Sequence, residues 1–257
     1  MNRINQAFSA GKAFIPFITG GDPDLETTEK LLFALCESGA DMIEIGVPFS
    51  DPIAEGPVIE AADERALKAG FTVDKLFSLV ERVRQDIKIP LLFMTYYNPI
   101  FVYGVSRFTG RCAICGLDGL IVHDLPFEER EELLEPCLSH GLELISLIAP
   151  TSEERIAKIA KNSDGFLYCV SSLGVTGVRQ NLGGGARSMI ERVRQVSGIP
   201  CAVGFGISTP EQAREVAGFA DGIIVGSAIV RLIAEHGRDC VAPVTQYARE
   251  IKRSILA

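Results

Sequence analysis

Short apolar runs alternate with longer amphipathic stretches along most of the chain. Runs of about four to seven apolar residues are separated by stretches of about ten to fifteen, the pattern of parallel strands joined by crossover helices. Most of the runs are apolar throughout, which is expected of a sheet covered on both faces. Eight strands are predicted, at residues 14–19, 42–46, 90–96, 119–122, 143–148, 166–169, 201–203 and 222–225.

No Pro/Ser-rich linker and no run of like charges divides the chain, so one domain is predicted over residues 1–257. Eight strand–helix units in about 250 residues match the size of a (β/α)₈ TIM barrel. An open doubly wound sheet is the competing architecture. That fold usually carries a glycine-rich dinucleotide turn after its first strand, and Gly-Gly-Asp-Pro at 20–23 is not one. The α/β barrel is therefore the predicted fold.

Charge and cysteine content argue against several function classes. A net charge of −8 argues against nucleic acid or an anionic membrane as a partner. No apolar stretch reaches about 18 residues, so no membrane span is expected, and the first strand begins too early to leave room for a signal peptide. Seven scattered cysteines predict reduced thiols in a cytoplasmic protein.

The only Cys-x-x-Cys pair, Cys112 and Cys115, falls in a stretch predicted to be helical, 108–115. No second ligand pair accompanies it, so two buried or half-buried small side chains are expected rather than a redox or zinc centre.

Glycine-rich loops follow the last three predicted strands, at 174–177, 204–208 and 226–228. In TIM barrels a phosphate group is often held after strands seven and eight, and glycine lets backbone amides approach its oxygens. One such loop would be explained as an ordinary turn. Three of them at the appropriate strand ends predict a phosphate site.

One carboxylate, Glu44, interrupts the apolar second strand. Burial without a positive partner raises the pKa of a carboxyl group, which is how a general acid works near neutral pH. The alternative is a structural carboxylate paired with a neighbouring donor, but a position near the end of the strand favours catalysis. The stiff loop 48–57 adds Asp51 and Glu55, and composition does not decide which of the two faces a substrate.

Residues 44–57 resemble the signature of the tryptophan synthase α chain family. Further segments match that family in the same order, so the resemblance spans essentially the whole chain: 14–24, 96–99, 124–126, 174–177, 203–208 and 225–230. The strand-two motif is highly specific, whereas the Gly-Phe-Gly and Gly-Ser motifs are shared with other phosphate-binding barrels. The resemblance implies a lyase that cleaves indole-3-glycerol phosphate into indole and glyceraldehyde 3-phosphate by a retro-aldol reaction.

The resemblance also implies roles for individual residues. Glu44 matches the acid–base group that protonates indole C3 and helps to remove the proton of the adjacent hydroxyl. A second carboxylate stabilises positive charge on the indole nitrogen; the family has Asp there and this chain has Glu55, whose extra methylene displaces the carboxylate by about 1 Å. Tyr168 lies at the active-site end of strand six, and Thr176 lies on a mobile loop and contacts Glu55. The other implied site residues are Gly177, Gly206, Gly226 and Ser227 for phosphate, and Phe17, Met94, Tyr96 and Phe205 for the indole ring.

Two positions depart from the family pattern without a functional explanation. His123 stands where the family usually has Pro, and Ser172 stands where many members have Arg. His123 is expected to be a tolerated residue at the rim of the site.

The resemblance implies an αββα complex in which the β subunit carries pyridoxal phosphate and receives indole through a tunnel. No cofactor and no metal is expected in this chain, whose three histidines are a poor basis for a metal-dependent epimerase. Three alternatives remain open. They are a stand-alone lyase, a weakly active chain that mainly activates a β subunit, and another phosphate-binding barrel such as a sugar-phosphate isomerase.

Overall fold

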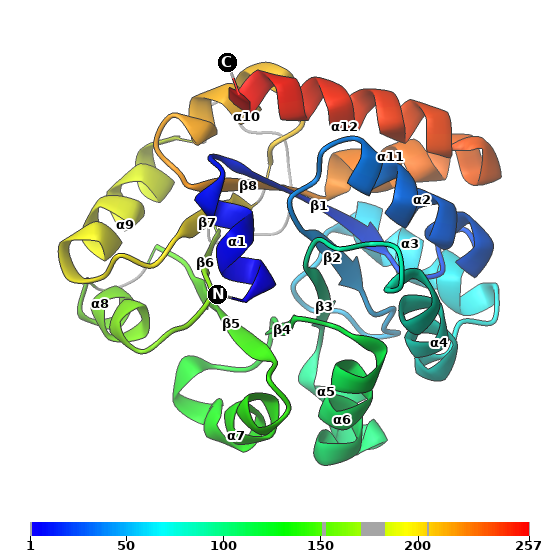
Figure 1. The fold of residues 1–257 in the computed structure, drawn as a ribbon, viewed down its shortest axis with the longest axis horizontal. Coiled ribbons are helices and arrows are strands. Elements are labelled where there is room, and N and C mark those ends of the chain that lie inside the picture. Colours follow the sequence, from blue (N-terminus) through cyan, green and yellow to red (C-terminus); the bar gives the residue numbers. More distant parts are fainter. Residues whose placement is uncertain (1, 151–152, 171–182, 205, 257) are drawn as a thin grey trace.

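Eight parallel strands close into a barrel that is ringed by helices (Figure 1). The computed structural model describes residues 2–150, 153–170, 183–204 and 206–256. The strands follow one another around the barrel in chain order, and β1 pairs with β8 to close it. The strands are β1 (Ala13–Thr19), β2 (Ile43–Gly46), β3 (Leu91–Thr95), β4 (Gly119–Val122), β5 (Glu143–Ile148), β6 (Leu167–Val170), β7 (Cys201–Gly204) and β8 (Gly222–Val225).

All eight predicted strands are confirmed, each bound differing from the prediction by at most one residue. The stretch 108–115 is helical, as expected, and belongs to a longer helix. The described helices are α1 (Arg3–Ser9), α2 (Leu25–Glu37), α3 (Pro57–Lys68), α4 (Val73–Val83), α5 (Tyr97–Tyr103), α6 (Val105–Cys115), α7 (Glu131–Ser139), α8 (Glu153–Lys161), α9 (Gly183–Val196), α10 (Pro210–Ala217), α11 (Ser227–His236) and α12 (Val241–Leu256), with 3-10 turns η1 (Phe127–Glu129) and η2 (Gly237–Asp239).

Side chains along each strand alternate between the barrel interior and the layer between barrel and helices. In β2, Ile43 and Ile45 belong to the outer apolar cluster. Because successive side chains on a strand point to opposite faces, Glu44 points into the barrel. The residues that pair with it across the sheet, Phe17 of β1 and Leu92 of β3, belong to the interior cluster. The carboxylate therefore lies among apolar interior side chains.

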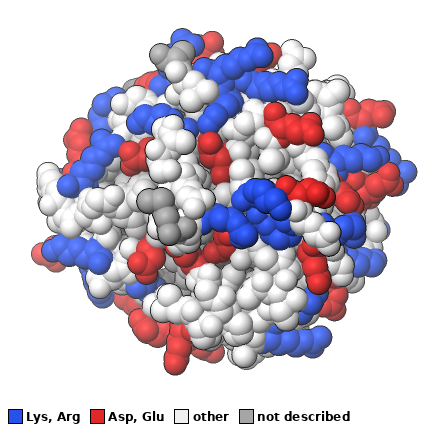
Figure 2. All heavy atoms as spheres, in the orientation of Figure 1, with Lys and Arg blue, Asp and Glu red and all other residues white. Residues whose placement is uncertain are grey.

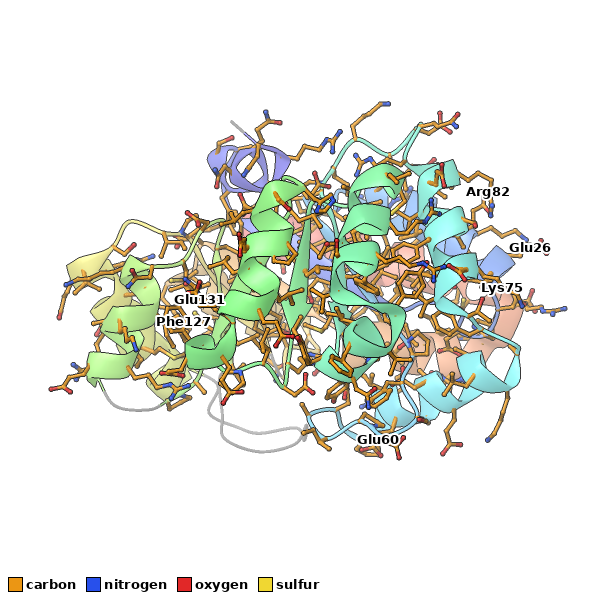
Figure 3. All side chains as sticks on the ribbon, turned by 90° about the horizontal axis from the view of Figure 1, so that it is seen from below. Glu26, Glu60, Lys75, Arg82, Phe127 and Glu131 are labelled. Carbon is orange, nitrogen blue, oxygen red and sulfur yellow. The ribbon has the colours of Figure 1, made fainter. Side chains whose placement is uncertain are left out.

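Helix α1 fills the end of the barrel at which the strands begin. Ile4 is buried in the interior cluster, and the Phe8 ring centroid lies 5.4 Å from that of Phe166, just before β6. A view at right angles places α1 at one end of the barrel and Glu60 of α3 at the other (Figure 3). Acidic and basic side chains lie interspersed over the α1 end (Figure 2). The carboxyl ends of the strands, away from α1, are left for a site.

An ion pair holds the first βα loop onto α3. Asp22 is fully buried, and both of its oxygens accept from the guanidinium of Arg65, at 2.7 and 2.8 Å. The pKa of Asp22 is raised because burial outweighs the nearby cation. Such a bidentate pair fixes the geometry of both segments.

Candidate functional site

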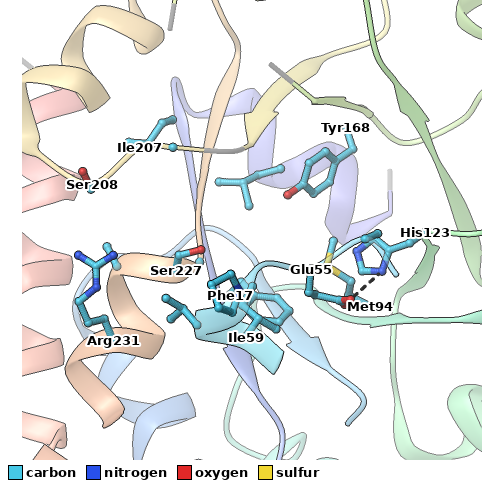
Figure 4. A pocket seen from close by; sticks show the side chains of 17 residues that line it. Phe17, Glu55, Ile59, Met94, His123, Tyr168, Ile207, Ser208, Ser227 and Arg231 are labelled. Carbon is cyan, nitrogen blue, oxygen red and sulfur yellow. Dashed lines mark ion pairs between the residues drawn. The ribbon is translucent and has the colours of Figure 1, made fainter. Parts of the chain in front are cut away.

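A cavity opens at the carboxyl ends of the strands and has two chemically different ends (Figure 4). Glu55 and His123 lie at one end, and Ser227, Ser208 and Arg231 lie at the other, with the Phe17 ring between them. The lining residues are Phe17, Ala54, Glu55, Pro57, Val58, Ile59, Met94, His123, Tyr168, Gly206, Ile207, Ser208, Ile224, Gly226, Ser227, Ala228 and Arg231. An elongated site with an acid at one end and donors at the other suits a substrate with an anionic tail.

Glu44 is not among the lining residues and lies in the barrel interior, where it pairs across the sheet with the lining residue Phe17. Its side chain is 0% exposed, and neither carboxylate oxygen has a hydrogen-bond partner among the described residues. Burial raises the pKa of Glu44 well above its ordinary value, which favours the protonated carboxyl. The nearby Tyr168 lines the cavity, and burial together with the Glu44 charge raises the pKa of its phenol.

Glu55 is the loop acid that faces the cavity. Its Oε2 accepts a hydrogen bond from the Tyr96 hydroxyl, and its Oε1 lies 3.5 Å from Nδ1 of His123. Burial, reinforced by the charge of Asp63, raises the pKa of Glu55 to about 8. Asp51, the other candidate acid in this loop, is exposed to solvent and is not among the lining residues.

Tyr96 and His123 both contact Glu55. Tyr96, predicted to line the indole pocket, donates to Oε2 of Glu55 and is not among the lining residues of this cavity. Its hydroxyl also accepts from the backbone N–H groups of Ile53 and Ala54, at 3.1 and 2.8 Å, so that it anchors the loop. His123, expected at the rim, is only 12% exposed and lines the cavity.

The opposite end of the cavity is built around the start of α11. Gly226 and Ser227 line it, together with Gly206 beyond β7. The first backbone N–H groups of a helix have no partner within that helix and attract anions. Arg231 lies one helical turn after Ser227 and also lines the cavity, a contribution that sequence reasoning missed. The i, i+4 spacing from Ser227 was the signal for it.

Glycines at two strand ends make room for the aromatic side chains of the site. A Cβ on Gly46 would lie 2.6 Å from Cζ of Phe17, and one on Gly204 would lie 2.4 Å from the Tyr168 hydroxyl. Gly204, expected in a phosphate loop, instead ends β7 and accommodates the Tyr168 ring. Glycine is therefore required at both positions for close packing.

Several predicted residues cannot be placed. Thr176, Gly177 and Phe205 lie outside the described residues, as do Ser172 and the loop 174–177. The other predicted contacts to substrate, Phe17 and Met94, line the cavity.

The cysteines form no metal or disulfide centre in the described part of the chain. All seven thiols are free; Cys36 is partly exposed and the other six are buried, including Cys112 and Cys115 as expected. Within the residues that the structure describes, no cluster of three or more His, Cys, Asp or Glu side chains could hold a metal ion. Over the same residues, no helix combines the length and apolar character needed to cross a membrane.

Comparison with known proteins agrees with this geometry. A family model described as tryptophan synthase alpha chain matches residues 4–255. The chain is similar to the tryptophan synthase alpha chain of Lacticaseibacillus casei, with 44% identity over 99% of this chain and 96% of the relative. It is also similar to that of Thermoanaerobacter pseudethanolicus, with 48% identity over 91% and 92% of the two chains.

Solved structures give the same result. The chain resembles the tryptophan synthase subunit alpha of Legionella pneumophila, with a TM-score of 0.89, 37% identity and coverage of 99% and 98% of the two chains. It also resembles a chain of the Pyrococcus furiosus tryptophan synthase complex, with a TM-score of 0.86, 36% identity and coverage of 95% and 98%. By sequence and by fold, the chain belongs to the tryptophan synthase alpha chain family, whose reaction is the aldolase-type cleavage of indole-3-glycerol phosphate.

Proposed function

We propose that this chain cleaves indole-3-glycerol phosphate into indole and glyceraldehyde 3-phosphate, with Glu44 as the acid–base group, in the last steps of tryptophan biosynthesis. The observation that carries this proposal is the carboxyl of Glu44, which points into the barrel with both oxygens unpaired in the described structure. Its raised pKa supplies a proton near neutral pH, where an ordinary Glu is ionised.

The reaction requires one proton to be delivered and one to be removed. Protonation of indole C3 by Glu44 places a positive charge on the ring nitrogen. The Glu44 carboxylate left by that transfer then takes the proton of the adjacent side-chain hydroxyl, so that the oxygen forms a carbonyl. The carbon–carbon bond to C3 breaks, its electron pair returns to the ring, and indole and the aldehyde separate. The apolar interior around Glu44 keeps water from competing for these protons.

The two ends of the cavity support the placement of this substrate. Glu55, at one end, stabilises the positive charge on the indole nitrogen, while Phe17 and Met94 contact the ring. At the other end, the phosphate is bound by Gly206, Gly226 and Ser227, with Arg231 as an additional cation. We also assign to the site Tyr168 beside Glu44 and, from the family match alone, Thr176, Gly177 and Phe205.

A β subunit is the proposed partner, in an αββα heterotetramer, and it is the subunit that holds pyridoxal phosphate. Exposed apolar side chains at the mouth of the barrel support this docking. Ile53 is 78% exposed, and Phe101 and Val102 of α5 are 63% and 78% exposed. The hydroxyl of Tyr96, which directly precedes α5, accepts from the backbone of Ile53, so the loop that carries Ile53 lies beside the start of α5. Apolar patches of this kind mark protein interfaces.

The same proposal treats residues 1–257 as one cytoplasmic domain that needs no cofactor of its own. The barrel strands run from residue 13 to residue 225, and α12 packs against α2 and α10, which joins the end of the chain to its beginning.

A coupled assay tests the function. Glyceraldehyde 3-phosphate formation from indole-3-glycerol phosphate is measured for the wild-type chain and for Glu44→Gln, with and without a β subunit. Product formation by wild type that is strongly increased by the β subunit supports the proposal. Full activity without such an increase indicates a stand-alone lyase, and β-subunit activation without cleavage indicates an activator chain.

A further inference from the structure

His123 lies against both Glu55 and Tyr96 in the wall of the cavity. Its backbone N–H donates to the carbonyl of Thr95 at 3.2 Å, and its ring centroid lies 5.3 Å from that of Tyr96. Nδ1 of His123 faces Oε1 of Glu55 at 3.5 Å and has no hydrogen bond among the described residues. A buried ring nitrogen without a partner is costly, so this contact needs a chemical explanation.

The hydrogen bonds of Tyr96 determine where a proton on Glu55 must lie. A phenol hydroxyl donates one hydrogen bond and accepts through its lone pairs. The backbone N–H groups of Ile53 and Ala54 both donate to it, so its own proton is directed to Oε2 of Glu55. Because Oε2 is thus an acceptor, a proton carried by Glu55 lies on Oε1. That oxygen is the one that faces Nδ1 of His123.

We propose that His123 is a positioning residue that exchanges one proton with Glu55 during the reaction. In the empty site the proton is on Oε1 of Glu55 and the imidazole is neutral. When positive charge develops on the indole nitrogen, this proton passes from Oε1 to Nδ1, which leaves a carboxylate beside that charge. No bond to substrate forms, and the net charge of the pair is unchanged. The inference rests on the proposed role of Glu55 in the cleavage.

The surroundings favour a neutral pair in the empty site. Burial raises the pKa of Glu55 to about 8 and lowers that of His123 to about 4. Asp63 and Glu60 of α3, and Asp124 beyond β4, also raise the pKa of Glu55 through their charges. Once the proton has moved, the carboxylate of Glu55 lies beside Nδ1 of His123, at 3.5 Å, and pairs with the imidazolium. The other titratable side chains that line the cavity are Tyr168 and Arg231.

A pH profile distinguishes proton exchange from simple packing. His123→Phe keeps a ring against Tyr96 but cannot accept a proton, so Glu55 must then release its proton to water. With a pKa of about 8, roughly 3% of Glu55 is ionised at pH 6.5 and roughly 90% at pH 9. The ratio of wild-type to variant kcat is therefore expected to be about 30 at pH 6.5 and below about 3 at pH 9, with KM nearly unchanged.

Two further measurements make the result specific. His140→Phe changes an exposed histidine at the C-terminus of α7, before β5 begins, and is expected to leave the profile unchanged. In a Glu55→Gln background, His123→Phe is expected to cost less than about twofold, because no proton remains to be exchanged. If His123→Phe does not fold, His123→Asn replaces it, since it also cannot take up a proton.

Several outcomes overturn the inference. A loss in His123→Phe that is the same at pH 6.5 and pH 9 leaves only a packing role, and no loss at either pH removes His123 from the mechanism. Both results leave the proposed function intact if the wild-type chain forms glyceraldehyde 3-phosphate. A wild-type chain that forms no product refutes the proposed function, and this inference with it.

Discussion

Replacing Glu44 with Gln removes the titratable carboxyl from the barrel interior and nearly preserves the shape of the side chain. A positioned acid–base group contributes about 10²–10⁴-fold to a reaction rate. Because Glu44 is the group to which both proton transfers are assigned, kcat is expected to fall by about 10³-fold or more. The phosphate end of the cavity lies across the site, around Ser227, so the affinity for inorganic phosphate is expected to change by less than about threefold.

The same substitution is expected to stabilise the fold in a pH-dependent way. Burial raises the pKa of Glu44 in the folded protein, whereas the unfolded chain titrates near 4.5. Below pH 4.5 both states hold the proton, and Glu44 imposes no pH-dependent penalty. Above pH 4.5 only the unfolded state releases it, which lowers the free energy of unfolding by about 1.4 kcal/mol per pH unit, up to the folded pKa. Gln does not titrate, so the free energy of unfolding of the Glu44→Gln variant does not fall with pH in this way.

Urea denaturation of wild type and Glu44→Gln at pH 5.5, 6.5 and 7.5 measures this difference. The gap in the free energy of unfolding is expected to widen with pH, by up to about 1.4 kcal/mol per unit until the folded pKa of Glu44 is reached. All other titrating groups are common to both proteins and cancel. Glu191→Gln, at an exposed position on α9, is the matched control. Its difference from wild type in the free energy of unfolding is expected to stay the same at all three pH values. A constant gap for Glu44→Gln would refute a protonated, buried Glu44.

Two other substitutions test the contacts that position the site. Gly204→Ala places a methyl group 2.4 Å from the Tyr168 hydroxyl and is expected to cost about 1–3 kcal/mol in thermal or urea unfolding, together with a loss of kcat. Gly198→Ala, with nothing within 4 Å of the new Cβ, is its control. Arg65→Met leaves the buried Asp22 without its cation and is expected to lower the free energy of unfolding by about 3 kcal/mol, which urea denaturation detects. Arg65→Lys should recover only part of this, because an ammonium cannot reproduce the bidentate geometry; full recovery would contradict a geometric role.

The barrel could be predicted from the sequence because its strands are buried on both faces. Each strand is then a continuous apolar run, and eight such runs at the spacing of crossover helices leave few alternatives. Glu44 could be predicted as a site residue for the same reason, since one carboxylate among apolar residues is conspicuous. Its direction follows from the alternation of Ile43 and Ile45 with interior positions.

The contacts around Glu55 could not be predicted from the sequence, because they depend on how the barrel closes. Tyr96 and Glu55 are 41 positions apart in the chain, and no local pattern shows that the hydroxyl of one binds the carboxylate of the other. His123 comes from a third loop and reaches the same carboxyl. Which glycines face aromatic rings is equally hidden, since Gly46 and Gly204 look like ordinary strand ends in the sequence.

The distribution of the seven cysteines has a practical consequence for experiments on the intact chain. Thiolates react with alkylating reagents, and burial both shields a thiol and raises its pKa, as it does for Cys112 and Cys137. Only Cys36 is partly accessible in the folded chain. The pKa of Cys36 is also raised by burial, so iodoacetamide labelling followed by peptide mass spectrometry is expected to record one site that reacts faster than the other six, because it is the more accessible one. The slow rates would report, position by position, how often each part of the protein opens.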